Sequence, residues 1–269
     1  MIEQYSPQPR LAADRLSSGL SDLARTTVRA AQVLIDVGLV ASEDWRAGMP
    51  PGRAIELTVE AVAAFLVEVQ AARQNGVPAI AALASGDALL VLSEEASPAG
   101  GVETLSVTFA MREPAPIEIL SMLTRVCEEF GAFHGQVEDD RLLMMYTSER
   151  AAQRAWEATP PELRQFLPGP EEMPEVTVPR LLIPQEYDRR RVPSGVWWVN
   201  YWDAEQVETV GRERTLTAGW AEILRAPAGA LALLATKEPL NPLRADHAEQ
   251  LSRLIRAIGL GELQEQFRY

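Results

Sequence analysis

The sequence predicts an α+β protein built from two β-α-β-β-α-like, ferredoxin-like layers, in which antiparallel sheets carry helices on one face. Three observations lead to this fold class. The order β-α-β-β-α can be read over residues 104–158 and again over 194–269, although the two stretches share no sequence identity. A helical segment precedes the first of them. Eight prolines between 159 and 193 separate them, and proline disfavours both helix interiors and central strands.

These observations also predict the domain organisation. Residues 1–158 would hold the N-terminal helices and the first α+β unit, and 159–193 would be an extended, proline-rich connection. Residues 194–269 would form the second unit, packed on the first as one globule.

The N-terminal part reads as two helices. Apolar side chains recur at helical spacing between residues 11 and 40, among them Leu16, Leu20 and Leu34, and predict a helix that ends near Gly38. A second apolar stripe predicts a helix over about 57–74, ended by the Asn-Gly pair at 75–76.

The first α+β unit begins with two strands, 88–92 and 104–111, which flank a Gly-containing loop as in a hairpin. A helix with prolines near its start is expected to end near Gly131. Strands at 133–137 and 141–147 would then be joined by an acidic turn, Glu138-Asp139-Asp140, before a short helix over 148–158.

The second unit begins with an aromatic strand, Val196–Trp202, after which Asp203 would cap a helix that ends near Gly211. Gln206 stands three residues after Asp203, the spacing of a capping box. A hairpin over 220–225 and 230–236 and a last helix over about 244–258 complete the unit.

The composition favours a cytoplasmic protein with basic partners. The 269 residues carry 38 acidic and 25 basic side chains, a net charge of −13, and residues 101–178 alone hold 14 acids and 6 bases. Such a surface repels nucleic acid and steers the encounter with basic partners. The sequence has no apolar run long enough to span a membrane, no basic-then-apolar leader, and one cysteine, Cys127, so no internal disulfide is expected.

Sequence patterns typical of catalysis are missing. His134 and His247 have no second ligand type at a metal-binding spacing, and Cys127 stands beside Glu128 and Glu129, whose charge raises a thiol pKa. No P-loop and no nucleophile elbow occurs. We therefore expect no enzymatic activity, no cofactor and no metal.

Two kinds of residue remain as candidates for binding a partner. The first is acidic: the turn Glu138-Asp139-Asp140 and the stretch with Glu171, Glu172 and Glu175. The second is aromatic. Alternation along the strand puts Trp198 and Trp202 on the face opposite Val199, where they would be exposed if only one face meets the core, and buried if both faces are covered.

A Leu-rich helix with Leu34 is followed by Trp45, Gly48, Asn75, Leu90 and the pair Gly100-Gly101. In these positions the chain resembles the immunity protein 52 family, over roughly residues 30–260. The C-terminal part, with its aromatic strand, hairpin and last helix, is similar to related immunity families of type VI secretion systems. The family opens with an aromatic strand, whereas residues 4–14 here read as a poor strand, so the sequence leaves open whether this strand is present, altered or missing.

The resemblance implies a cytoplasmic antidote that binds and occludes a toxin used between competing bacteria, with restriction-endonuclease-fold nucleases as the commonest partners. A basic nuclease would suit the acidic charge of this chain. Two other functions stay open: an enzyme of unrecognised type that uses the carboxylates at 138–140, and a small-molecule-binding module built on the aromatic strand.

Overall fold

The computed structural model describes residues 10–48, 52–77, 80–86, 88–95, 101–108, 116–138, 178–179, 181–183, 185–241 and 244–269. The chain divides into two compact units, Met1–Gln136 and Val137–Tyr269. The predicted strand over 141–147, the short helix over 148–158 and most of the proline-rich connection lie outside the described residues. The predicted domain bounds of 1–158, 159–193 and 194–269 therefore stay a prediction.

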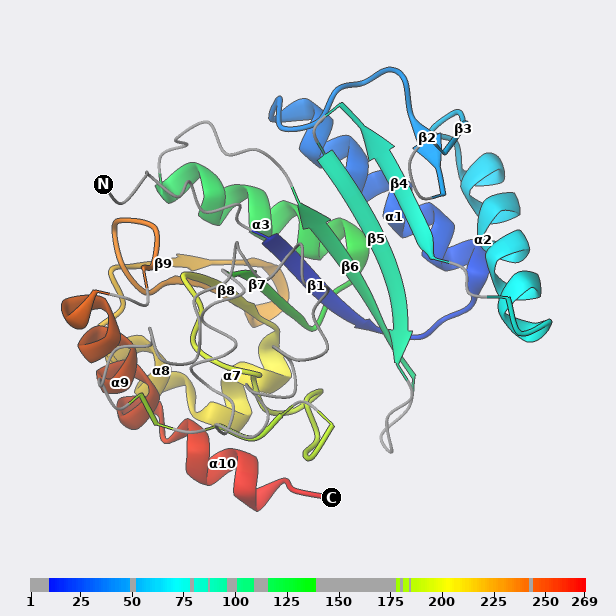
Figure 1. Ribbon diagram of the computed structural model, residues 1–269. Coiled ribbons are helices and arrows are strands. Elements are labelled where there is room, and N and C mark those ends of the chain that lie inside the picture. The colour runs from blue at the N-terminus through cyan, green and yellow to red at the C-terminus, as the bar shows by residue number, and fades with distance from the viewer. Residues whose placement is uncertain are drawn as a thin grey trace, which may run out of the picture. The chain divides into compact units, whose positions relative to one another are not determined.

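The described residues of unit 1 form three long helices and a sheet (Figure 1). Its elements are β1 (Arg10–Leu16), α1 (Leu20–Asp36), β2 (Arg46–Ala47), β3 (Arg53–Ala54), α2 (Val59–Gln74), β4 (Ala81–Ser85), β5 (Ala88–Glu95), β6 (Val102–Thr108), α3 (Pro116–Phe130) and the first three residues of β7 (His134–Glu138). The strand order is β3-β2-β4-β5-β6-β1-β7. Neighbours from β3 to β1 pair antiparallel, and the predicted hairpin of β5 and β6 is confirmed.

The helices of unit 1 line one face of its sheet (Figure 1). α1 packs between α2 and α3, α3 contacts β1, and α2 contacts β4. The predicted boundaries of α2 and α3 are confirmed within a few residues: Thr58 accepts a hydrogen bond from the Ala61 N–H at the start of α2, and Gly131, with φ of 72°, follows the end of α3. Local signals therefore set these two helices.

The N-terminal segment differs from the prediction. Residues 10–16, which include Leu16, form the strand β1 and not part of a helix, and Gly19, with φ of 97°, separates this strand from α1. β1 pairs with β6 over seven residues and buries Leu11, Ala13 and Arg15. Residues 10–14 thus lie in a strand although the stretch 4–14 reads as a poor one, because long-range pairing with β6 overrides the weak local preference.

A second strand in unit 1 escaped prediction. β4 has the sequence AALAS, and alanine and serine are not typical strand residues. It forms because β5 lies across a tight turn at Gly86, with φ of 56°, and because its residues Ala82 and Leu83 fill the core. Tertiary packing, and not strand propensity, therefore decides that residues 81–85 form a strand.

The described residues of unit 2 form a small sheet and four helices. Its elements are β8 (Val199–Trp202), α7 (Ala204–Val210), α8 (Arg212–Thr217), β9 (Glu222–Arg225), the 3₁₀ turn η2 (Pro227–Gly229), β10 (Leu231–Leu234), α9 (Ala245–Ile258) and α10 (Leu260–Gln266). The strand order β8-β10-β9 is antiparallel throughout, so β8 and β9 run parallel with β10 between them. This is the predicted split β-α-β arrangement.

Three details of unit 2 differ from the prediction. β8 begins at Val199 and not at Val196, and the short helices α8 and α10 were not predicted. Asp203 does cap α7, since its carboxylate accepts from the Gln206 N–H at 3.0 Å. The Gln206 side chain also donates to the Arg189 carbonyl oxygen at 3.0 Å.

The α+β class and the antiparallel sheets are observed, but the ferredoxin-like layering is not confirmed. In unit 2, every residue of β8 and β10 is buried, so neither face of these strands is open to solvent. The expectation of helices on one face only does not describe them, because strands this apolar need cover on both faces.

Candidate functional site

The acidic candidates fall largely outside the described residues. Glu138 is the last residue of β7, which places its backbone at a strand end as expected for a turn. Asp139, Asp140, Glu171, Glu172 and Glu175 lie outside the described residues. Their role in binding a partner stays a prediction.

The aromatic candidates are part of the core of unit 2. Trp198 is 4% exposed and Trp202 is 0% exposed, so the interpretation that they form an open face is wrong and the buried alternative holds. The Trp198 indole donates to the Thr236 carbonyl oxygen at 3.0 Å, and the Trp202 ring meets the Trp220 ring edge to face at 5.5 Å.

A buried amide explains why a polar residue stands between these two tryptophans. Asn200 is fully buried, and its side-chain oxygen accepts from the Trp197 N–H at 2.9 Å. Its amide donates to the Trp197 carbonyl oxygen at 2.9 Å and more weakly to that of Leu233 at 3.4 Å. Asn200 thus satisfies backbone groups where the chain enters β8, so the aromatic run is structural.

The histidines and the cysteine have structural surroundings. His134 is buried, with its Nε2 atom 2.9 Å from Gln136 Oε1. His247 Nδ1 accepts from the Asn241 N–H at 2.9 Å, and burial, with a smaller effect of Arg244, lowers the pKa of His247. Burial, followed by the charges of Asp14 and Glu128, raises the pKa of the Cys127 thiol well above its ordinary value, the reverse of what a nucleophile needs.

Within the described ranges, no group of three or more histidine, cysteine or acidic side chains could hold a metal ion. The described helices also include none that is long and apolar enough to cross a membrane.

Unit 1 contains a buried charge network that the sequence did not reveal. Arg15 and Glu103 are each 3% exposed, and the Arg15 Nε atom lies 2.8 Å from a Glu103 carboxylate oxygen. The same guanidinium contacts Asp22 at 2.8 Å and Thr26 at 2.7 Å, and it stacks over the Phe130 ring at 5.3 Å. These contacts hold β1 against β6, α1 and α3.

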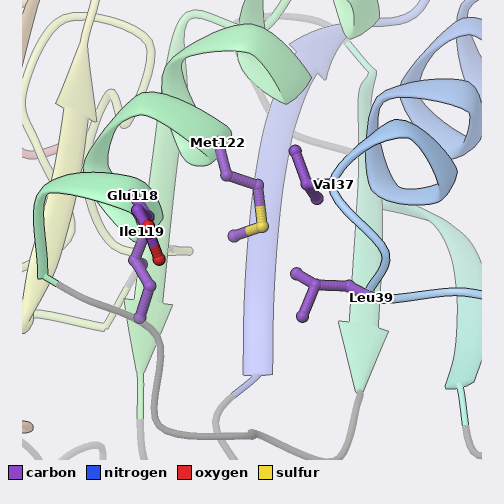
Figure 2. A pocket seen from close by; sticks show the side chains of 5 residues that line it. All are labelled: Val37, Leu39, Glu118, Ile119 and Met122. Carbon is purple, nitrogen blue, oxygen red and sulfur yellow. The ribbon is translucent and has the colours of Figure 1, made fainter.

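An open pocket in the described part of unit 1 lies between the end of α1 and the first turns of α3. It has a volume of about 320 Å³ and is lined by Val37, Leu39, Glu118, Ile119 and Met122. Figure 2 shows the Met122 side chain reaching from α3 toward Val37 and Leu39, with Glu118 and Ile119 one turn earlier on the same helix. Because its two walls are some 80 residues apart in the chain, local sequence patterns could not find this pocket.

Comparisons with known proteins give little further identification. No protein-family model and no curated protein matches the chain. Among solved structures, the chain is similar to the Pseudomonas aeruginosa T6SS protein PA0821, with 12% identity and a TM-score of 0.46 over 93% of this chain and 73% of that one. At this level the similarity supports no assignment of family or function.

Proposed function

We propose that this chain is an immunity protein that binds a cognate antibacterial toxin in the cytoplasm and neutralises it by occlusion. The observation that carries the proposal is the acidic charge: a net charge of −13, with 14 acids against 6 bases between residues 101 and 178. An acidic chain attracts a basic partner over a distance and raises the rate of encounter. A nuclease toxin has a basic surface wherever it holds DNA, which makes it the partner that fits this charge best.

The resemblance to the immunity protein 52 family belongs to the same proposal. The residues that carry it build the fold: Leu34, Trp45 and Leu90 are buried in the core of unit 1. Asn75 ends α2 and donates to the Ala71 carbonyl oxygen at 2.9 Å. These positions are structural in this chain, so partner choice would depend on surface residues that differ between immunity proteins.

An occluding inhibitor carries out no reaction and needs no cofactor. Its interface would bury about 1,200–2,000 Å² and depend on a few anchors. Since Trp198 and Trp202 are buried, the acidic residues Glu138, Asp139 and Asp140 are the first candidates for the toxin-facing surface, followed by Glu171, Glu172 and Glu175.

The first experiment is co-purification of the tagged chain with the product of the neighbouring gene, followed by a nuclease assay with and without the chain. A one-to-one complex that loses nuclease activity supports the proposal. A neighbouring product that neither binds nor is inhibited, tested at micromolar concentrations, contradicts it.

Charge reversal then tests the acidic turn. The triple variant Glu138→Lys, Asp139→Lys, Asp140→Lys should slow association with the toxin by about tenfold or more at low salt and flatten its salt dependence. A matched control reverses the charge of Glu60, Glu213 and Glu249, which are exposed acids on three different helices. It changes the net charge of the chain by the same amount, from −13 to −7. If the two triple variants slow association to the same extent, the turn does not face the toxin.

A further inference from the structure

The described helices of unit 1 leave one face of its sheet uncovered. α1, α2 and α3 lie on one side of the strands (Figure 1), and successive side chains of a strand point to opposite sides. On the helix side, Leu90, Leu105 and Val107 are fully buried. On the other side, β5 and β6 present three neighbouring pairs whose members are half-buried or exposed: Leu89–Thr108, Val91–Ser106 and Ser93–Thr104. These six residues are called the outward face.

The outward face carries no charge, although 23% of the residues of the chain are charged. The buried core of a protein–protein interface is likewise depleted in charged residues. Covering hydroxyl groups and small apolar side chains costs less desolvation than covering charges, and it fixes fewer rotatable bonds than covering lysine or glutamate. The composition therefore suits contact with the surface of another protein.

One carboxylate borders the outward face. Asp14 of β1 lies directly opposite Thr104, is half-buried, and accepts a hydrogen bond from the Thr104 hydroxyl at 2.5 Å. Within the described residues Asp14 forms no ion pair, whereas Glu103, on the helix side of the same sheet, is paired with Arg15 at 2.8 Å. Asp14 thus presents a negative charge that a cation of a partner protein can compensate.

We propose that the outward face is the surface that binds the toxin, with an arginine or lysine of the toxin at Asp14. The inference rests on the proposed function and names the surface through which the toxin is bound. Charge selects this occupant, because a basic partner supplies the cation that Asp14 lacks. A second copy of the chain would instead bring two Asp14 carboxylates and two net charges of −13 together, which electrostatic repulsion opposes.

Cysteine footprinting tests this surface directly. Cys127, the one cysteine of the chain, is buried, so the variant Ser93→Cys places the only accessible thiol of the folded chain on the outward face. Its alkylation by iodoacetamide should slow by about tenfold or more when the product of the neighbouring gene is bound, because the partner covers it. The matched control is Ser21→Cys, at an exposed position in the first turn of α1 on the helix side of the sheet. Its alkylation rate should change by less than about twofold.

Asp14→Asn tests the charge while keeping the shape of the side chain. The amide oxygen can still accept from the Thr104 hydroxyl, so the variant should fold, and protection of Cys127 from iodoacetamide verifies that unit 1 is intact. The dissociation constant for the toxin should rise by about tenfold or more, because a cation of the toxin loses its partner. Glu60→Gln removes an exposed acid in the first turn of α2 and should change that constant by less than about twofold.

The proposal is overturned if the Ser93→Cys thiol is alkylated equally fast in the free and the bound chain, or if Asp14→Asn and Glu60→Gln bind the toxin equally well. In either case, a toxin that the parent chain still inhibits leaves the proposed function standing. A neighbouring gene product that the parent chain neither binds nor inhibits overturns the proposed function and, with it, this inference.

Discussion

Removing the cation of the buried network should destabilise unit 1 far more than removing an exposed one. Arg15→Met leaves Glu103, 3% exposed, without its ion-pair partner at 2.8 Å. Loss of one member of a buried ion pair costs about 3–5 kcal/mol of unfolding free energy. With a urea m-value of about 2 kcal/mol/M, the midpoint of unfolding should fall by roughly 1.5–2.5 M.

Matched variants separate this effect from the mere loss of a positive charge. Arg25→Met removes an arginine whose side chain is 54% exposed and lies 3.4 Å from Asp22, a carboxylate that Arg15 also contacts. This variant should lower the free energy of unfolding by less than about 0.5 kcal/mol. The double variant Arg15→Met, Glu103→Leu removes both buried charges and should recover more than half of the loss, since no unpaired buried carboxylate remains.

Cys127 offers an assay that reports on unit 1 alone. It is the only cysteine of the chain, it is fully buried, and burial raises its thiol pKa, so iodoacetamide should modify it only in unfolded chains. The fraction modified across a urea series then gives the midpoint for each variant. The reasoning fails if Arg15→Met costs no more than Arg25→Met, or if the double variant is less stable than Arg15→Met.

Two further predictions concern unit 2. Asp203→Ala removes both the cap of α7 and the ion pair with Arg190 at 2.6 Å, so it should lower the free energy of unfolding by about 1–2 kcal/mol. Urea denaturation followed by tryptophan fluorescence measures this loss, and an unchanged midpoint would show that neither contact matters. The pKa of His247 is lowered from 6.5, mainly by burial, so the unfolded chain binds a proton there more readily than the folded chain. Stability should therefore decrease as the pH falls below about 6.5, and His247→Gln should flatten this decrease between pH 7.5 and 5.5; equal slopes in parent and variant would contradict the assignment.

Local sequence signals predicted those helices whose ends or buried face are marked by particular residues. α2 has its Thr58 cap and its Asn75 stop, α7 has its Asp203 cap, and α9 has an apolar stripe along one face. Such features act within one or two turns of a helix, so they can be recognised without knowing the partner that covers the helix.

The candidate site was less predictable. The acidic residues of the sequence could be named, but whether Trp198 and Trp202 are exposed depended on cover for both faces of β8, which alternation cannot reveal. The pocket between α1 and α3 had no sequence signal at all, because Val37 and Met122 become neighbours only when the two helices pack.

The sequence by itself determined the α+β class, the main helices, the antiparallel hairpins and the acidic charge, because each depends on local periodicity, turn chemistry or composition. The tertiary structure decided that residues 10–16 form a strand, that AALAS at 81–85 forms another, and that Arg15 is buried against Glu103. These three results share a physical cause: pairing with a distant strand or charge supplies free energy that exceeds a weak local preference.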